Sequence, residues 1–343
     1  MATTIRASAV GFVVAGAVLA VLLWLIDTGT VVAALLSADP ALVAAVGATI
    51  LLWNGFWGVA LWNVLRALEA DVGLPLAVLV NAAAAFFNHV SPVGQAGGEP
   101  ATAYLLTRSI GTDYEVNLAA VASHDAINVV PSVTLAAVGA AYYATTATID
   151  PDLRVLFAGV VAVAVSLPGV VAVAWRRRRG IERAVLGAAT RVLEATDRVA
   201  SAVPLLPAPP DPDGLADQLQ GFLSSLAVVA RDRRRLAAAV AFSAAGWGVQ
   251  AVGLWLSVLA VGGSIPLVVP FFVVPLGATA SVVPTPGGLG GVEVASVGLL
   301  ALLTGLDAGT ATAAVAIHSV GGYLLTSAVG AAAAGVLGAR GYR

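Results

Sequence analysis

Glu99 and Glu293 each end a short loop in which a proline is followed by glycines. The loop residues of interest are Pro92, Gly97 and Gly98 before Glu99, and Pro286, Gly287, Gly288 and Gly290 before Glu293. Proline ends a helix, and glycine permits left-handed backbone and the close approach of another segment. Backbone N–H groups in such loops could hold a phosphate. We expect the two glutamates to gate or couple transport, by protonation or by contact with a cationic group; the alternative is that each only caps N–H groups of its own loop.

A second set of polar residues surrounds these loops. His124, Asp125 and Asn128 share one helical face, since residues three and four apart are neighbours there. A histidine beside an aspartate within a membrane could carry protons near neutral pH. His318 stands in the second half of the chain where His124 stands in the first, and Asn88 adds polarity before the first loop. A histidine that is only hydrogen-bonded between helices is the alternative.

The composition puts these residues in a membrane. Of 343 residues, 59% are hydrophobic and only 10% are charged, whereas about a quarter of the residues of soluble domains are charged. Seventeen basic and 19 acidic residues cannot cover the surface of a soluble protein of this length. Cytosolic enzymes and nucleic-acid binders are therefore excluded. Without cysteine and with three histidines, we expect neither a metal centre nor a cofactor.

Six apolar runs are long enough to cross a bilayer, which takes about 20 residues. They are 9–26, 42–65, 116–143, 155–175, 236–260 and 310–337. Two further runs, 74–90 and 266–283, meet the glycine-rich loops, and the arms that follow are too short to cross. We therefore expect an all-α polytopic protein with about six full spans and two re-entrant helical hairpins; ordinary spans in place of each hairpin are the alternative. Trp53, Trp57 and Trp62 are interpreted as packing and interface anchors rather than as a binding site.

The positions of the arginines predict how the chain is oriented across the membrane. Eleven of the 17 basic residues lie between Arg176 and Arg235, and the positive-inside rule then makes loop 176–235 and both termini cytoplasmic in a cell-membrane protein. Arg154 alone falls on the other side. The loop holds a proline-rich break between two amphipathic stretches, which we expect to lie along the inner leaflet. A solvated helical linker is the alternative.

The two glycine-rich loops belong to an internal repeat. Shifting the chain by 194 residues superimposes them without a gap, and 14 of the 33 positions from Pro92 to His124 are then identical. Chance would give about one in ten. We predict a single membrane domain over residues 1–343, with repeat 1 at about 41–143 and repeat 2 at about 235–337. The predicted orientation inverts one repeat relative to the other, as in many secondary transporters.

The paired loops resemble those of the lysylphosphatidylglycerol synthase transmembrane-region family, flippase-like membrane domains found alone or fused to lipid-modifying enzymes and glycosyltransferases. The resemblance covers most of the chain and implies movement of a lipid or lipid-linked substrate between leaflets. The sequence departs from the family where arginines are usual. Thr102 follows the first motif, and Asp125 and either His318 or Ser319 occupy the later helices. The residues that carry the resemblance are Gly97, Gly98, Glu99, Pro286, Gly287, Gly288, Gly290 and Glu293.

These observations predict flippase-like translocation of a phospholipid or a polyprenyl-phosphate-linked glycan. No enzymatic activity is expected, because no serine or metal constellation accompanies the acidic residues. One alternative is a non-transporting membrane subunit that anchors or regulates a glycosyltransferase or lipid synthase, which would then be a partner. A second is an ion-coupled transporter of a small polar solute. No nucleic-acid partner is expected.

Overall fold

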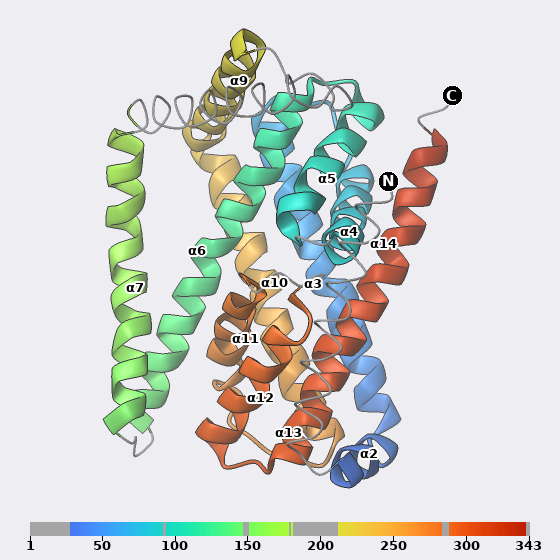
Figure 1. The fold of residues 1–343 in the computed structure, drawn as a ribbon, viewed down its shortest axis with the longest axis vertical. Coiled ribbons are helices and arrows are strands. Elements are labelled where there is room, and N and C mark those ends of the chain that lie inside the picture. Colours follow the sequence, from blue (N-terminus) through green and yellow to red (C-terminus); the bar gives the residue numbers. More distant parts are fainter. Residues whose placement is uncertain are drawn as a thin grey trace, which may run out of the picture.

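The computed structural model describes residues 28–91, 94–146, 151–177, 180, 212–282 and 288–340, and the regular elements within these ranges are all helical (Figure 1). The all-α class is therefore confirmed. Predicted residues Pro92, Pro286 and Gly287, the run 9–26 and the first amphipathic stretch of the cytoplasmic loop lie outside the described residues. The elements are α2 (Thr28–Leu36), α3 (Pro40–Ala67), α4 (Leu74–Val90), α5 (Gln95–Ile110), α6 (Tyr114–Thr146), α7 (Pro151–Arg176), α9 (Pro212–Arg231), α10 (Arg233–Ala260), α11 (Pro270–Thr279), η1 (Ala280–Val282), α12 (Gly291–Thr304), α13 (Ala308–Val315), η3 (Ala316–Val320) and α14 (Gly321–Arg340).

Four helices in the described part of the chain are long and apolar enough to cross a membrane. They are Pro40–Ala67, Tyr114–Thr145, Arg233–Ala260 and the continuous rod Ala308–Ala339 formed by α13, η3 and α14. They coincide with four of the six predicted spans, and α7 covers a fifth, 155–175. The chain is therefore a multi-pass membrane protein.

Aspartates cap three of these helices. Asp39 Oδ1 accepts hydrogen bonds from the N–H groups of Ala41 and Leu42, at 2.8 and 3.3 Å. Asp232 caps α10 through Arg235 N at 3.0 Å, and Asp307 caps α13 in the same way. A capping carboxylate satisfies N–H groups that have no partner inside the helix, which fixes where each long helix begins.

Glycines fix the ends of the shorter helices α5 and α12. Gly111 ends α5 at φ 74° and Gly305 ends α12 at φ 70°, both in the left-handed region that favours glycine. These two glycines are repeat mates, and α6 and α13 start three residues after them. The starts differ, because α5 follows Gly94 at φ 57° whereas α12 follows Gly290 at φ 92°.

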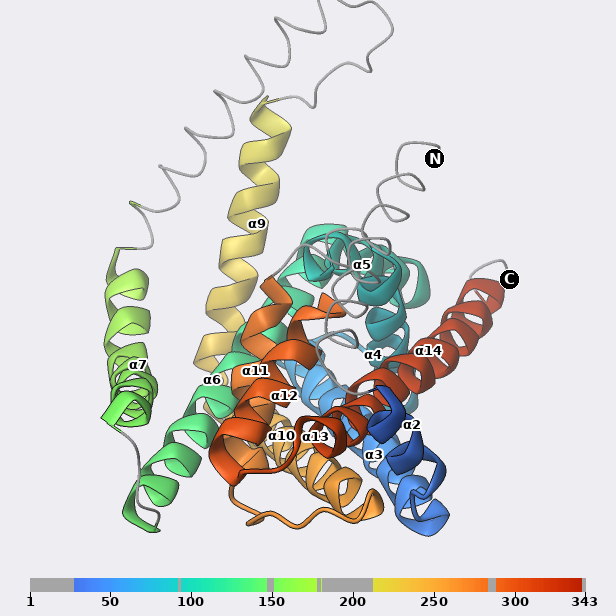
Figure 2. The ribbon, with the colours of Figure 1, turned by 60° about the horizontal axis from the view of Figure 1, so that its bottom comes forward.

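The helices form two packed halves around a central pair. α3 and α10 make the most extensive interhelical contact, and α14 lies along α4. One hydrophobic core joins α3 to α4, α5 and α6 through residues such as Leu65 and Leu106, and a second joins α10 to α11, α12 and α13 through Phe272 and Leu300. In Figure 1 the first hairpin (α4 and α5) occupies the upper half and the second hairpin (α11 and α12) the lower half, and Figure 2 gives a second view of the same arrangement.

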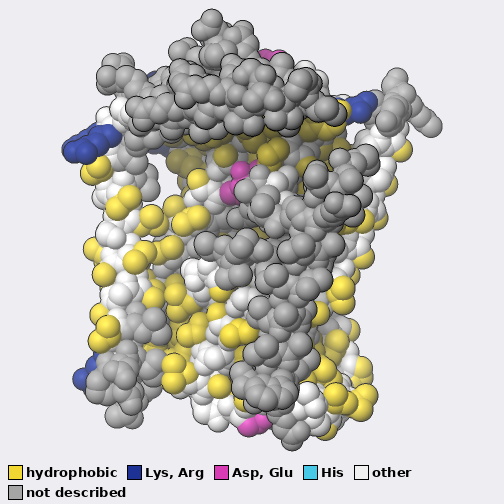
Figure 3. Space-filling view, in the orientation of Figure 1, with side chains coloured by type: hydrophobic (Ala, Val, Ile, Leu, Met, Phe, Trp, Pro, Cys, Tyr) yellow, Lys and Arg dark blue, Asp and Glu magenta, His cyan; other side chains and the backbone are white. Residues whose placement is uncertain are grey.

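Most of the described arginines gather at one end of the bundle, the end opposite Arg154 in the first turn of α7. Helices α3, α5 and α7 end there with Arg66, Arg108 and Arg176 in their last turns, and α10 begins there with Arg233 (Figure 1). On the face in Figure 3, basic side chains lie at the upper and lower edges, with hydrophobic side chains between them. This distribution is typical of a bundle whose middle faces lipid.

The second amphipathic stretch of the predicted loop forms α9. Its C-terminal part packs against α6, and Val229 is buried in the core that contains the α3 residues. The helix therefore joins the bundle at its arginine-rich end. Its placement along the inner leaflet stays a prediction.

Candidate functional site

A cavity of about 710 Å³ lies where the two hairpins meet, and both apolar and polar side chains line it. Its lining comes from α3, α4, α5 and α6 of the first half and from α10, α11, η1, α12, α13, η3 and α14 of the second. The three histidines of the protein, His89, His124 and His318, all line it. Among the described lining residues there are three carboxyl groups and no arginine. Ionisable residues are rare in membrane interiors and usually mark functional sites, so this cavity is the candidate site.

The cavity brings most of the predicted site residues together. The hairpin glycines belong to the backbone around it: Gly97 and Gly98 lie in the first turn of α5, and Gly288 and Gly290 precede α12. The predicted side chains that line the cavity are Asn88, Glu99, His124, Asp125, Asn128, Glu293 and His318.

Glu293 is buried and held by two donors. Its Oε2 accepts a hydrogen bond from Gly290 N at 2.5 Å, and its Oε1 accepts one from Ser319 Oγ at 2.5 Å. The first bond is the loop cap that the sequence offered as the alternative role. Ser319 lies in η3, a π-helical turn that interrupts the last long helix. Such turns often occur at functional sites, because the additional residue redirects the side chains beside it.

Glu99 is only partly buried. It lines the cavity together with Asp125 of α6, whose position in the second half is occupied by Ser319. Asp125 Oδ1 also lies 3.3 Å from His124 Nδ1. The first half therefore contributes two carboxyl groups to the cavity lining, one of them beside His124, whereas Glu293 of the second half is held by a hydroxyl group and an N–H group.

The imidazole of His124 is fixed by the backbone of α3. Its Nε2 lies 3.1 Å from the carbonyl oxygen of Trp57. A carbonyl can only accept, so Nε2 carries a hydrogen, and in the neutral ring Nδ1 keeps its lone pair toward Asp125. His124 therefore bridges α6 and α3 and contacts an acid in the cavity. Its role as a proton carrier stays a prediction.

Gly98 allows the two arms of the first hairpin to touch. A Cβ atom there would lie 1.8 Å from Asn88 Oδ1 and 2.7 Å from Asn88 N. Asn88 Oδ1 is itself buried and makes no hydrogen bond within the described structure. Gly288 plays a comparable part in the second hairpin, since its φ is 74° and a Cβ atom would lie 2.7 Å from the Cβ of Ser281. The glycines thus permit close packing beside the cavity.

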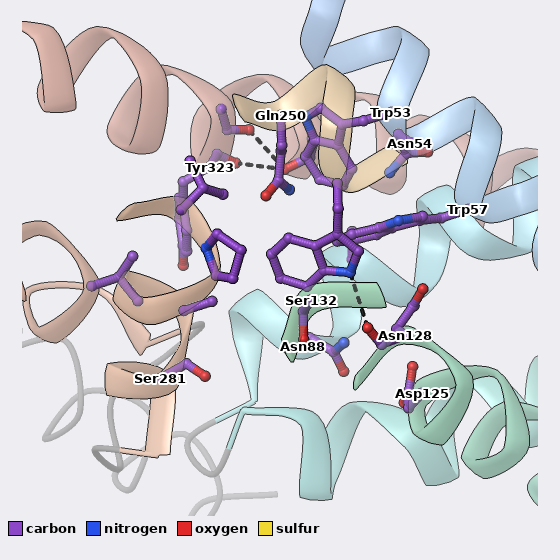
Figure 4. A pocket seen from close by; sticks show the side chains of 18 of the residues that line it. Trp53, Asn54, Trp57, Asn88, Asp125, Asn128, Ser132, Gln250, Ser281 and Tyr323 are labelled. Carbon is purple, nitrogen blue, oxygen red and sulfur yellow. Dashed lines mark hydrogen bonds between the residues drawn. The ribbon is translucent and has the colours of Figure 1, made fainter. Parts of the chain in front are cut away.

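Tryptophans form a wall that the sequence analysis did not assign to the site. Trp53 and Trp57 line the cavity together with Trp247, with ring centroids 4.7 Å apart for the first pair and 5.4 Å for Trp57 and Trp247 (Figure 4). Trp53 and Trp57 therefore pack as the sequence predicted, and they also line the candidate cavity. Trp62 lies away from the cavity, and its Nε1 donates to the Val72 carbonyl.

Asn128 makes hydrogen bonds between helices through both its side chain and its backbone. Its side-chain oxygen accepts a hydrogen bond from Ser243, and its backbone carbonyl accepts one from Trp247 Nε1 at 3.0 Å. Both partners lie on α10, so Asn128 joins α6 to the central helix pair while it lines the cavity.

Another contact that the sequence did not reveal joins α4 to α14. His89 Nδ1 lies 2.7 Å from Ser327 Oγ, and the hydroxyl of Tyr323 donates to the His89 carbonyl at 3.0 Å. The rings of His89 and Tyr323 stack with centroids 4.0 Å apart. The only available signal was the polarity of His89 just before the first loop, because its partners are more than 200 residues away. Within the described residues, no three His, Asp or Glu side chains are grouped as a metal site.

The chain resembles known membrane proteins along most of its length. A UPF0104 membrane protein of Methanothermobacter thermautotrophicus is 24% identical over 290 residues, which cover 83% of this chain and 79% of that protein. The profile of the lysylphosphatidylglycerol synthase TM region matches residues 8–330, which include both hairpins and the cavity between them. The chain therefore belongs to the lysylphosphatidylglycerol synthase transmembrane-region family.

Proposed function

We propose that this membrane protein translocates a phospholipid or a polyprenyl-phosphate-linked glycan between leaflets, through the cavity between its two hairpins. The observation that carries the proposal is the cavity itself: a space of about 710 Å³ that both halves of the chain line, with three carboxyl groups among mostly apolar side chains. Ligand sites have volumes of about 300–1,000 Å³. A space of this size suits a lipid headgroup whose acyl or prenyl chains stay in the bilayer.

We propose that the two hairpins are re-entrant and belong to inverted repeats. The lengths of their second arms support this, since α5 has 16 residues and α12 has 14, fewer than the roughly 20 needed to cross. Their location in opposite halves of the bundle supports inversion (Figure 1). The arginine-rich end would then be cytoplasmic in the cell membrane, with both termini on that side.

The lining suggests how a headgroup would be held. The carboxyl groups of Glu99, Asp125 and Glu293 accept hydrogen bonds from hydroxyl or ammonium groups. The tryptophan faces offer apolar surfaces against which a headgroup can pack, and Figure 4 shows Trp53 and Trp57 across the cavity from Tyr323. No arginine lines the described cavity, so this chain lacks a bidentate phosphate clamp there. The function requires no bond to be made or broken, and we propose no enzymatic activity.

Translocation by the purified protein tests the proposal. Proteoliposomes with a headgroup-labelled fluorescent phospholipid report flipping through a membrane-impermeant quencher. We expect the wild type to speed quenching of inner-leaflet lipid at least tenfold over empty liposomes, and the double variant Glu99→Gln/Glu293→Gln to lose most of that gain. Glu115→Gln, at the start of α6 and outside the cavity lining, is the matched control.

Two results would contradict the proposal. Unchanged flipping in the double variant would remove the two glutamates from the mechanism. An inactive wild type, with both labelled phospholipid and labelled prenyl-phosphate glycan, would instead favour a membrane subunit that serves a separate enzyme.

A further inference from the structure

The indole N–H groups of Trp57 and Trp247 are engaged with the backbone. Trp57 Nε1 donates to the Ser243 carbonyl at 3.3 Å, and Trp247 Nε1 donates to the Asn128 carbonyl at 3.0 Å. Both rings belong to the tryptophan wall of the cavity, together with Trp53. Because their polar atoms are already bonded, these two indoles offer a ligand mainly their ring carbons.

Gly246 lets the Trp57 ring lie directly against α10. A Cβ atom at Gly246 would lie 2.3 Å from Trp57 Nε1 and 2.5 Å from Trp57 Cδ1, so a larger residue would displace the ring. The close contact and the hydrogen bond to α10 fix Trp57 before any ligand binds. A side chain that is already fixed loses little conformational freedom on binding, which favours affinity.

The rings of the tryptophan wall contact one another instead of surrounding a point. The centroids of Trp53 and Trp57 are 4.7 Å apart at an interplanar angle of 64°, and those of Trp57 and Trp247 are 5.4 Å apart at 60°. Rings at these separations touch directly, so no ligand group fits between them. An aromatic cage for an ammonium group needs ring faces on several sides of the cation. The tryptophan wall offers one apolar side instead, which suits a flat ligand.

Amide and carboxyl side chains are frequent in the rest of the lining, and Figure 4 shows several of them together with the tryptophan rings. Amide groups both donate and accept hydrogen bonds, as the hydroxyl groups of a sugar do. Polar groups of this kind fix the orientation of a ligand that packs on an apolar surface. The amide and carboxyl residues of the lining are Asn54, Asn81, Asn88, Asn128, Gln250, Glu99, Asp125 and Glu293.

A sugar ring has the two kinds of surface that this lining complements. Its C–H groups form an apolar face that stacks on an aromatic ring, and its hydroxyl groups form a polar rim that donates and accepts hydrogen bonds. A glycerol headgroup has no such ring face, and an ethanolamine headgroup has an ammonium group in place of the hydroxyl rim.

We propose that the cavity prefers lipids whose headgroup carries a sugar ring, which stacks on the tryptophan wall while its hydroxyl groups bind the amide and carboxyl side chains. This inference rests on the proposed translocation and names its preferred substrate class. Phospholipids without a sugar enter the same cavity with lower affinity.

Equilibrium binding to the purified protein in nanodiscs tests the preference without any transport. Radiolabelled short-chain prenyl phosphates that carry glucose, mannose, galactose or N-acetylglucosamine are compared with the same prenyl phosphate without a sugar, after subtraction of binding to empty nanodiscs. We expect at least one sugar-bearing ligand to bind about tenfold more tightly than the sugar-free ligand. Equal affinities of the sugar-free ligand and all the sugar-bearing ligands would overturn the proposal.

Two competitors identify the source of the recognised group. Short-chain phosphatidylethanolamine should displace the best sugar-bearing ligand only weakly, and stronger binding of this lipid than of every sugar-bearing ligand would overturn the proposal in favour of an ammonium site. The free sugar should compete less well than its prenyl phosphate, because it lacks the chain that the bilayer holds. A free sugar that competes equally well would overturn the lipid part of the proposal and indicate a soluble sugar.

Variants of the tryptophan wall test the stacking. Trp57→Leu should lower the affinity of the best sugar-bearing ligand about tenfold and that of the sugar-free ligand much less, whereas Trp57→Phe keeps an aromatic face and should retain most of the preference. Gly246→Ala should weaken sugar binding as well, because it displaces the Trp57 ring without changing a lining side chain. Trp62→Leu, on α3 but outside the lining, is the matched control.

A Trp57→Leu protein that elutes as the wild type does in size-exclusion chromatography and keeps the full preference for sugar would overturn the stacking. Binding and flipping then separate the two proposals. Sugar-dependent binding by a protein that flips no lipid would support the sugar site and contradict translocation, and lipid flipping by a protein without sugar-dependent binding would do the reverse.

Discussion

At the scale of residues, the site depends on partners that differ between two otherwise matching motifs. The internal repeat predicted equivalent roles for Glu99 and Glu293, and both residues line the same cavity. It could not predict that Ser319 would donate a hydrogen bond to Glu293, because that contact depends on how η3 packs on the second hairpin. The tryptophan wall escaped prediction for the same reason, since Trp57 and Trp247 are far apart in sequence and adjacent only after α3 and α10 pack.

Gly98 offers a direct test of hairpin packing. Gly98→Ala would place a methyl group against the side chain and backbone of Asn88, and we expect it to lower the free energy of unfolding by about 2 kcal/mol. The change is measured as the thermal unfolding midpoint of the protein in detergent. Gly298→Ala is the control: it lies in α12 with open space around its added Cβ, so alanine there should stabilise slightly. Equal midpoints for the two variants would contradict the contact.

At the scale of elements, the polar residues and glycines that separate the apolar runs predicted where many of the helices begin and end. Four long helices coincide with predicted spans, and the glycine-rich loops separate the arms of the two hairpins. The π-helical turn η3 was not predicted, and its repeat mate around His124 lies in regular α-helix. The two segments differ in sequence after the histidine, and η3 packs against α12, α10 and α3.

The cap of α13 predicts a pH-dependent contribution to stability. Hydrogen bonds from the hydroxyl and backbone N–H of Thr310 lower the pKa of Asp307 below its ordinary value, and the N–H bond measures 2.9 Å. Because the pKa is lower in the folded protein than in the unfolded chain, the ionised cap stabilises the fold above about pH 4 and loses its effect as pH falls through the lowered value.

We therefore expect Asp307→Ala to cost about 1 kcal/mol at neutral pH and the deficit to narrow below about pH 4. Thermal unfolding of both proteins across this range measures it. Asp307→Ser keeps a cap acceptor without a titrating group, so it should restore most of the stability and show no narrowing. A deficit for Asp307→Ala that stays constant down to about pH 3 would contradict this role.

At the scale of the whole molecule, two hairpins from opposite halves of the bundle line one cavity that contains three carboxyl groups. The repeat in the sequence predicted that the hairpins would be related, and the hydrophobic cores of the two halves explain how each is held. The cavity itself could not be derived from the sequence. Its walls are set by the α3–α10 contact and by α14 lying along α4, contacts between segments that are distant in the chain.

Inverted topology predicts that repeat-related sites label from opposite sides of the membrane. The chain contains no cysteine, so single cysteines can be introduced without background. Asp113→Cys puts a thiol at the start of α6, and Ala308→Cys puts one at the start of α13, one residue after the repeat mate of Asp113; both positions are exposed. In intact cells, a membrane-impermeant maleimide should modify Cys at 308 and leave Cys at 113 unmodified until the cells are opened. Modification of both from the same side would make the repeats parallel.

The most direct test of the central claim, that the cavity receives the headgroup, is photo-cross-linking in the membrane. A phospholipid with a diazirine in its headgroup is incorporated into proteoliposomes, irradiated, and its attachment sites are mapped by mass spectrometry. We expect labels on cavity residues of both halves, such as Trp57 and Tyr323, and competition by unlabelled lipid. Labels confined to the exposed lipid-facing surface of α7, with none in the cavity, would contradict the account.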